Sequence, residues 1–137
     1  MRYKSNNLLI DNFKVENLVK KYSTPIYCYS HSKLEENIKK FQKDFRKINP
    51  IICFAVKSNP NVSLLKEIGK LGLGADVVSI GELMKALKSG IKPNKIVFSG
   101  VGKTSNEIEY AIKKKILLIN AESKSENLVI ERISKLK

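Results

Sequence analysis

A lysine, Lys57, ends a segment that has the pattern of a buried strand. The stretch FAVKSNPN follows the apolar run IIC, and the turn-forming residues SNP come directly after the lysine. Because alternate side chains of a strand share a face, we expect Lys57 beside Cys53 and Ala55, which are small enough to leave room for a ligand. Partial burial would lower the pKa of Lys57 and make its amine a nucleophile toward carbonyl groups.

The residues alone leave a second interpretation of Lys57 open. The lysine would then simply begin a loop and extend its ammonium group into water, as long charged side chains usually do. The chain contains 26 lysines and arginines, and all of these except Arg2, Arg46 and Arg132 are lysines. A lysine at a strand end is therefore weak support for chemistry when taken by itself.

Three other polar residues lie at or near the ends of apolar runs. Asp76 lies inside the run ADVVS, where a buried acid requires a partner. Ser79 ends that run, and Ser99 falls near the end of the run KIVFSG. Ser79 also has a sufficient structural role, because it is followed by Glu82 at the spacing of a helix capping box. We expect these residues at the edge of a sheet where ligands bind in parallel α/β folds.

The elements that would position these residues repeat along the chain. Four β-branched runs end at Lys57, Ser79, Ser99 and Asn120, at spacings of 22, 20 and 21 residues. The segments between them have helical periodicity. This alternation indicates an α/β fold with parallel strands. The predicted strands span residues 51–56, 75–79, 95–100 and 116–121, and two clear helical segments span residues 61–72 and 79–90.

Further local signals predict where other elements begin. Capping-box spacing occurs at Ser32, Ser79, Thr104 and Ser123, each followed by a glutamate three residues later. The first of these predicts a helix over residues 32–47. The stretch STPIYCYS, residues 23–30, is predicted to form another strand with Pro25 near its start.

Two glycine-containing stretches have simpler interpretations than nucleotide binding. GLGAD precedes a predicted strand, whereas a dinucleotide-binding glycine motif follows one. SGVGKT has Val97 where a P-loop needs its first glycine, so we do not expect ATP binding.

Composition excludes several classes of site. The net charge is +13, but the lysines alternate with glutamates on predicted helix faces, and arginine, which favours bidentate base contacts, is scarce. Specific nucleic-acid binding is not expected, although a basic binding module without catalysis stays as an alternative. Cys28, Cys53 and His31 offer no metal-ligand spacing, so we expect no metal and reduced thiols. No stretch has the pattern of a signal peptide or membrane span, and we expect a cytoplasmic protein with no membrane partner.

Four motifs, in order, resemble the strand-end motifs of the diaminopimelate decarboxylase family: FAVKSNPN, GLGADVVSIGEL, VFSGVGKT and NAES. The opening stretch, residues 6–30, also resembles the start of that family. Members are pyridoxal-phosphate enzymes of the alanine-racemase-like barrel class. The resemblance implies an α/β fold in which this chain is the N-terminal part of a pyridoxal-phosphate-binding (β/α)8 barrel, with about four parallel strands and intervening helices.

The resemblance also implies roles for the four candidate residues. Lys57 would carry pyridoxal 5'-phosphate covalently, Asp76 would lie near the cofactor and the lysine, and Ser79 and Ser99 would line the rim of the site. The reaction would be loss of CO2 from meso-2,6-diaminopimelate to give L-lysine. A family decarboxylase acting on another basic amino acid is the alternative, although the form Ser99–Gly100–Val101 favours the diaminopimelate branch over ornithine- and arginine-type relatives.

Several motifs of the family are absent from these 137 residues. They include the glycine-rich phosphate loop, the acid that pairs with the pyridine nitrogen, and the substrate-carboxylate arginines. The resemblance therefore implies a truncated form that is inactive alone and that takes a complementary C-terminal fragment as partner. The alternative is a chain that keeps some cofactor binding through Lys57. It also implies a homodimer and an amino-acid substrate. Residues 1–30 would include a strand of the β-rich second domain, and residues 31–137 would form the partial barrel.

Overall fold

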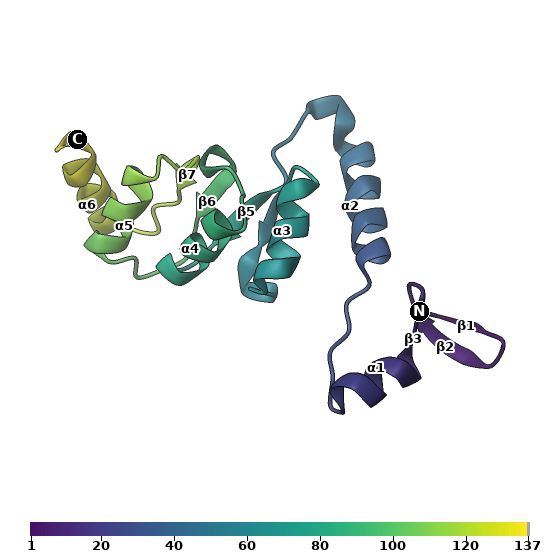
Figure 1. Ribbon diagram of the computed structural model, residues 1–137. Helices are drawn as coiled ribbons and strands as arrows, with labels where there is room; N and C mark the ends of the chain where they lie inside the picture. Colours follow the sequence, from purple (N-terminus) through teal and green to yellow (C-terminus); the bar gives the residue numbers. More distant parts are fainter. Residues whose placement is uncertain (137) are drawn as a thin grey trace. The chain divides into compact units, whose positions relative to one another are not determined.

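The computed structural model describes residues 1–136, which form two compact units, one over residues 1–49 and the other from residue 50 onward (Figure 1). Each unit has its own sheet. The predicted division at residue 30 refers to the domains of the family and stays a prediction.

The second unit is built on a parallel sheet of four strands. The strands lie in the order β4-β5-β6-β7, which is also their order along the chain. This confirms the predicted α/β alternation, although each strand is shorter than its apolar run. The elements are β4 (Cys53–Ala55), η2 (Val56–Ser58), α3 (Val62–Lys70), β5 (Gly74–Val77), α4 (Ile80–Lys88), η3 (Pro93–Lys95), β6 (Ile96–Phe98), α5 (Ser105–Lys113), β7 (Leu118–Ile119) and α6 (Lys124–Lys135).

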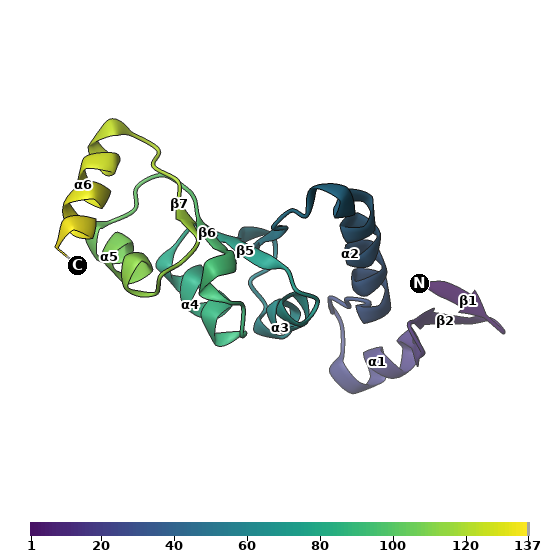
Figure 2. The same cartoon turned by 90° about the horizontal axis from the view of Figure 1, so that it is seen from above.

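One face of this sheet forms the core with the helices. Figure 2 shows α3 and α4 on the same side of β5 and β6. Alternate residues of the strands point toward the helices and are buried. The residues of α3, α4 and α5 that face the sheet are buried as well. Both observations follow from the periodicity of strands and helices, which places apolar residues on one side of each element. The fully buried large side chains are Phe98, Leu65, Ile68, Leu83, Ile96, Ile108, Val56 and Val77.

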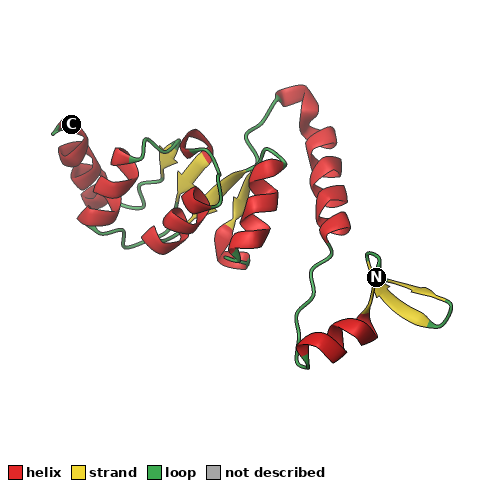
Figure 3. Cartoon of the chain, in the orientation of Figure 1, coloured by secondary structure: helices red, strands yellow, loops and turns green. Residues whose placement is uncertain are grey.

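The other set of alternate strand positions is only partly buried. Cys53 and Ala55 in β4, and Asp76 in β5, are intermediate in exposure, and Leu118 in β7 is half exposed. Figure 3 shows the yellow strands with red helices gathered on one side. The polar positions at the carboxyl ends of the strands therefore belong to the face that helices α3 and α4 of this unit do not cover (Figure 2).

Side-chain caps start the helices close to where the sequence predicts them. Thr104 and Glu107 form a complete capping box at α5. Ser79 and Ser123 also accept hydrogen bonds from the third helical amide, but their glutamates reach one residue further back, to the amides of Val78 and Glu122. Gly72 and Gly90 follow α3 and α4 with positive φ angles of 83° and 84°, a conformation that glycine commonly adopts after a helix end.

Glu107 also joins neighbouring helices. One carboxylate oxygen accepts from the amide and hydroxyl of Thr104 in its own cap, and the other accepts from the amide of Ile80 at the start of α4. These hydrogen bonds lower the pKa of Glu107, the bond from the Thr104 amide most strongly, while burial opposes them.

The first unit has a small antiparallel sheet and two helices. Its strands pair in the order β1-β2-β3. The elements are β1 (Arg2–Lys4), β2 (Asn7–Ile10), β3 (Phe13–Lys14), α1 (Val15–Tyr22), α2 (His31–Phe45) and η1 (Arg46–Ile48).

Two predictions for the first unit are wrong. Residues 23–30 form no strand, because no described strand pairs with them, and Tyr27 and Tyr29 project into solvent. Helix α2 is capped by Ser30 rather than Ser32: the Ser30 hydroxyl accepts from the amide of Lys33 at 3.0 Å and donates to Asp11. The cap therefore lies two residues earlier than the capping-box spacing predicts.

Within residues 1–136, no helix combines the length and the apolar character needed to cross a bilayer.

Candidate functional site

Lys57 lies two residues beyond the end of strand β4, in the middle of the 3-10 turn η2. Its side chain is exposed, so the expected partial burial is wrong, as is the expected continuation of strand alternation to this residue. The reason is local: the chain leaves the extended conformation at Val56, which turns into the core and is fully buried. Among residues 1–136, nothing forms a hydrogen bond or ion pair with the ammonium group of Lys57, so the amine is accessible to a ligand.

Asp76 and Ser99 are brought together at the same end of the sheet. The Ser99 hydroxyl donates to a carboxylate oxygen of Asp76 over 2.6 Å. The Asn120 side-chain amide in turn donates to the Ser99 oxygen over 2.9 Å. The three residues, from β5 and from the ends of β6 and β7, form a hydrogen-bonded row that we call the strand-end row. The partner that the sequence required for Asp76 is thus Ser99.

The row has a fixed hydrogen-bond direction. An amide N–H can only donate, so the Ser99 oxygen is the acceptor in its hydrogen bond with Asn120. The hydroxyl proton of Ser99 is therefore free to be donated to Asp76. A hydrogen bond to a carboxylate is shorter and stronger than one between neutral groups. The Asp76 carboxylate is therefore held in place from the side of β6.

Backbone register relates the row to Lys57. Asp76 pairs with Ala55 across β4 and β5, and Lys57 follows Ala55 by two residues. Lys57 and Asp76 therefore lie at the carboxyl ends of neighbouring parallel strands, where ligands bind in this kind of fold. No hydrogen bond or ion pair joins the side chains of Lys57 and Asp76 within the described residues.

The strands approach one another closely at Gly74, two residues before Asp76 in β5. A Cβ atom at Gly74 would come within 2.0 Å of the Lys95 carbonyl oxygen and 2.8 Å of the Cys53 sulfur. Burial raises the pKa of the Cys53 thiol, and the charge of Asp76 raises it further, while Lys95 opposes the shift. Asp76 thus acts electrostatically on the open face of the sheet as well as on Ser99.

Ser79 is not part of the strand-end row. Its hydroxyl oxygen accepts from the amide of Glu82 and begins α4, and no described hydrogen bond joins it to Asp76 or Ser99. A contact between Ser79 and a cofactor stays a prediction.

Two residues of this end of the molecule were not among the predicted site residues. Asn120 lies at the end of a predicted strand, 21 residues after Ser99. Its place in the repeat was the signal that could have found it, because equivalent strand ends meet at one edge. Lys103 is the second: its side chain is almost completely buried against Glu126, and only its glycine-containing stretch drew attention in the sequence.

The arrangement fits carbonyl chemistry better than metal chemistry. It combines an accessible primary amine, a carboxylate with a fixed orientation and a hydroxyl donor. Among residues 1–136 no group of three or more histidines, cysteines or acids could hold a metal ion.

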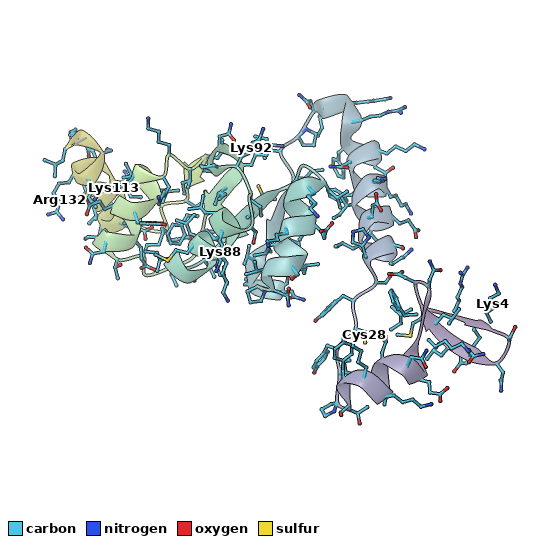
Figure 4. All side chains as sticks on the ribbon, in the orientation of Figure 1. Lys4, Cys28, Lys88, Lys92, Lys113 and Arg132 are labelled. Carbon is cyan, nitrogen blue, oxygen red and sulfur yellow. The ribbon has the colours of Figure 1, made fainter. Side chains whose placement is uncertain are left out.

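The basic side chains are spread over several elements: Figure 4 labels Lys88, Lys113 and Arg132, which lie on α4, α5 and α6.

Residues 31–136 match the pyridoxal binding domain of the pyridoxal-dependent decarboxylases. The chain belongs to this family. The match covers both Lys57 and the strand-end row, so this decarboxylase domain has its accessible amine and its fixed carboxylate inside the pyridoxal-binding segment.

Its relatives include diaminopimelate decarboxylases. The enzyme of Helicobacter pylori strain J99 is 48% identical over 122 residues, which are 89% of this chain and 30% of that protein. The enzyme of Aquifex aeolicus is 40% identical over 98% of this chain and 31% of that protein. A crystal structure of the diaminopimelate decarboxylase from M. jannaschii in complex with L-lysine superposes with a TM-score of 0.95 at 33% identity, covering 98% of this chain and 32% of that one. The chain spans about a third of the length of these relatives.

The residues present fit pyridoxal phosphate. A free primary amine at a strand end is the group that attaches an aldehyde cofactor. Ala55 and Cys53 are small and only partly buried, and Asp76, which pairs with Ala55 across the two strands, supplies a carboxylate with a fixed orientation beside them. The predicted fold, family and cofactor are therefore supported together.

Proposed function

We propose that this chain is the pyridoxal-phosphate-binding part of a diaminopimelate decarboxylase, which converts meso-2,6-diaminopimelate to L-lysine and CO2. The observation that carries the proposal is the accessible amine of Lys57 at the same sheet end as the Asp76–Ser99–Asn120 row, within the matched pyridoxal binding domain. The relatives named above support the choice of substrate, since they are diaminopimelate decarboxylases. Another basic amino acid is the alternative substrate within the family.

Each residue of the site has a proposed task. Lys57 would hold the cofactor through its side-chain amine. Asp76 holds a negative charge beside the cofactor, and Ser99, oriented by Asn120, keeps that carboxylate in position. Ser79 lines the rim. The bound pyridoxal ring supplies the electron sink for the carbon that loses CO2.

The parallel sheet of the second unit supplies four of the eight strands expected for the barrel. We infer that catalysis requires further strands, supplied by a complementary C-terminal polypeptide, and that the complete enzyme is a homodimer with residues 1–30 contributing to the β-rich second domain. The edge strand β7 has a half-exposed Leu118 and is the place where the next strand would pair. A cytoplasmic location stays a prediction from the sequence.

A chimera tests the proposal. The 137 residues of this chain replace the matching segment of the H. pylori enzyme, and L-lysine formation from meso-2,6-diaminopimelate is measured. We expect activity that falls to background in Lys57→Ala and persists in Lys66→Ala, a matched exposed lysine of α3. Equal activity of the two variants would contradict the role of Lys57. A folded chimera without activity would contradict the proposed function of this segment.

A further inference from the structure

Lys103 differs from the other lysines that form ion pairs in the described residues. Its side chain is 1% exposed and that of its partner Glu126 is 9% exposed, at a separation of 3.2 Å. The other described ion pairs join residues one helical turn apart on exposed helix surfaces, such as Lys135 with Glu131 in α6. Burying a charged pair carries a large desolvation cost that its attraction does not reliably repay. A role other than stability is therefore expected for this pair.

The ammonium group of Lys103 connects its own loop to helix α6. It donates to the carbonyl oxygen of Gly100 over 2.6 Å in the loop between β6 and α5. It also pairs with Glu126 in the first turn of α6, and it lies 5.7 Å from the centre of the Phe98 ring, which belongs to the core. The lysine thus joins the loop after β6 to the start of a helix more than 20 residues further along the chain.

Glu126 extends the connection to the loop between β7 and α6. Its carboxylate accepts from the amide of Glu122 over 2.7 Å, and its own amide donates to the Ser123 hydroxyl. Burial alone would raise the pKa of Glu126, but these contacts and the charge of Lys103 lower it overall, so the carboxylate stays charged.

The two connected loops carry two members of the strand-end row. Ser99 directly precedes Gly100, and Asn120 precedes Glu122 by two residues. Gly100 adopts a φ of 90°, and a Cβ atom there would lie 3.1 Å from the Cβ of Val78, so this loop also packs tightly against the end of β5. The buried pair therefore fixes both loops that hold the Asn120–Ser99–Asp76 contacts.

We propose that Lys103 is a positioning residue: its buried bridge to Gly100 and Glu126 sets the placement of Ser99 and Asn120, and through them the orientation of Asp76. That placement would serve the cofactor only if the proposed function is correct, but the coupling of the two loops does not depend on it. The residue acts through its neighbours and needs no contact with substrate or cofactor.

Paired substitutions separate positioning from stability. Lys103→Met leaves the Glu126 carboxylate buried without its cation, which destabilises the fold. Lys103→Met combined with Glu126→Gln removes that uncompensated charge, and the new side-chain carbonyl keeps an acceptor for the Glu122 amide. The matched control is Lys135→Met with Glu131→Gln, which makes the same charge change at the exposed pair of α6.

Hydrogen exchange of the full chain, followed by mass spectrometry, reports on both loops without any cofactor. In the neutral double variant we expect a melting temperature close to wild type, but exchange about tenfold faster in both segments 99–103 and 120–123. The exposed control pair should leave both segments unchanged. Labelling of Lys57 by pyridoxal phosphate should become less selective in the double variant only.

Other outcomes would overturn the proposal. If the double variant exchanges as wild type does, or only within segment 99–103, the bridge does not couple the loops. If the double variant fails to fold, the pair is structural. If both loops respond as expected while wild-type Lys57 is never labelled selectively, the positioning role stands and the proposed function fails.

Discussion

The two units of this chain bury their apolar residues to different degrees. In the second unit, the repeated strand and helix enclose a core in which Phe98, Leu65 and Ile108 are fully buried. In the first unit, helix α1 has no buried residue, Phe41 and Phe45 are nearly half exposed, and several tyrosines are largely exposed. A βα repeat creates its own apolar interface with each added unit, whereas a short meander and two helices enclose little. Most of the stability should therefore reside in the second unit.

The largest expected effect comes from emptying the core of that unit. Phe98→Ala removes a fully buried ring and should lower the free energy of unfolding by about 3–5 kcal/mol. Phe41→Ala in α2 is the matched control, because that ring is 49% exposed and stacks on Phe45. Urea denaturation followed by circular dichroism measures both. Similar losses for the two variants would show that the first unit is as well packed as the second.

A smaller effect is expected from the close approach of β5 to its neighbours. Gly74→Ala places a methyl group where it would meet the Lys95 carbonyl at 2.0 Å, so the strands must move apart, at about 1–3 kcal/mol. Gly81→Ala in α4 is the control: its nearest atom would be 3.9 Å away, and alanine favours the helix by up to about 1 kcal/mol. Opposite shifts of the melting temperature are expected. A Gly74→Ala protein as stable as wild type would contradict the tight pairing.

The smallest effect is on the pH dependence of the second unit. The pKa values of Glu107 and Glu126 are lowered in the folded chain, so both carboxylates bind protons more readily when unfolded. Their contribution to stability is therefore complete above the ordinary glutamate value of about 4.3 and is lost as the pH falls through the lower folded values.

Thermal melts between neutral pH and an acidic pH of about 3 measure this dependence. The Glu107→Gln variant should lose less stability on acidification than wild type, because it lacks one of the two carboxylates whose protonation destabilises the folded chain. Exposed Glu36 in the first unit provides the comparison, since its pair with Lys33 is open to solvent and should contribute little. If the Glu107→Gln variant loses as much stability on acidification as wild type does, the hydrogen bonds from Thr104 and Ile80 do not lower the pKa of Glu107.

The sequence predicts the second unit better than the first for a physical reason. Parallel strands between helices have two periodicities that appear directly in the residues, and the caps at Thr104 and Ser123 mark the helix starts. The first unit depends on contacts that spacing does not record. Ser30 and Ser32 are equally good caps by type, and the contact of this helix start with Asp11, which accepts from the Ser30 hydroxyl and the His31 amide, is not recorded in their spacing.

The sequence predicts which residues lie at the site better than it predicts which side chains contact one another there. Asp76 was expected to need a partner, and Ser99 is that partner, because their strands are neighbours in a parallel sheet. Lys57 was expected to be partly buried by strand alternation, but the turn at Val56 exposes it. The burial of Lys103 could not be predicted, since it depends on how α6 returns past the loop after β6.

The central claim is that Lys57 is the cofactor-binding lysine, and one measurement tests it directly. The full chain is incubated with pyridoxal phosphate, reduced with borohydride and mapped by peptide mass spectrometry, with Lys57→Ala and Lys66→Ala in parallel. Our account predicts dominant labelling at Lys57 in wild type and in Lys66→Ala, and loss of that labelling in Lys57→Ala. Labelling spread evenly over the exposed lysines in all three proteins would contradict it.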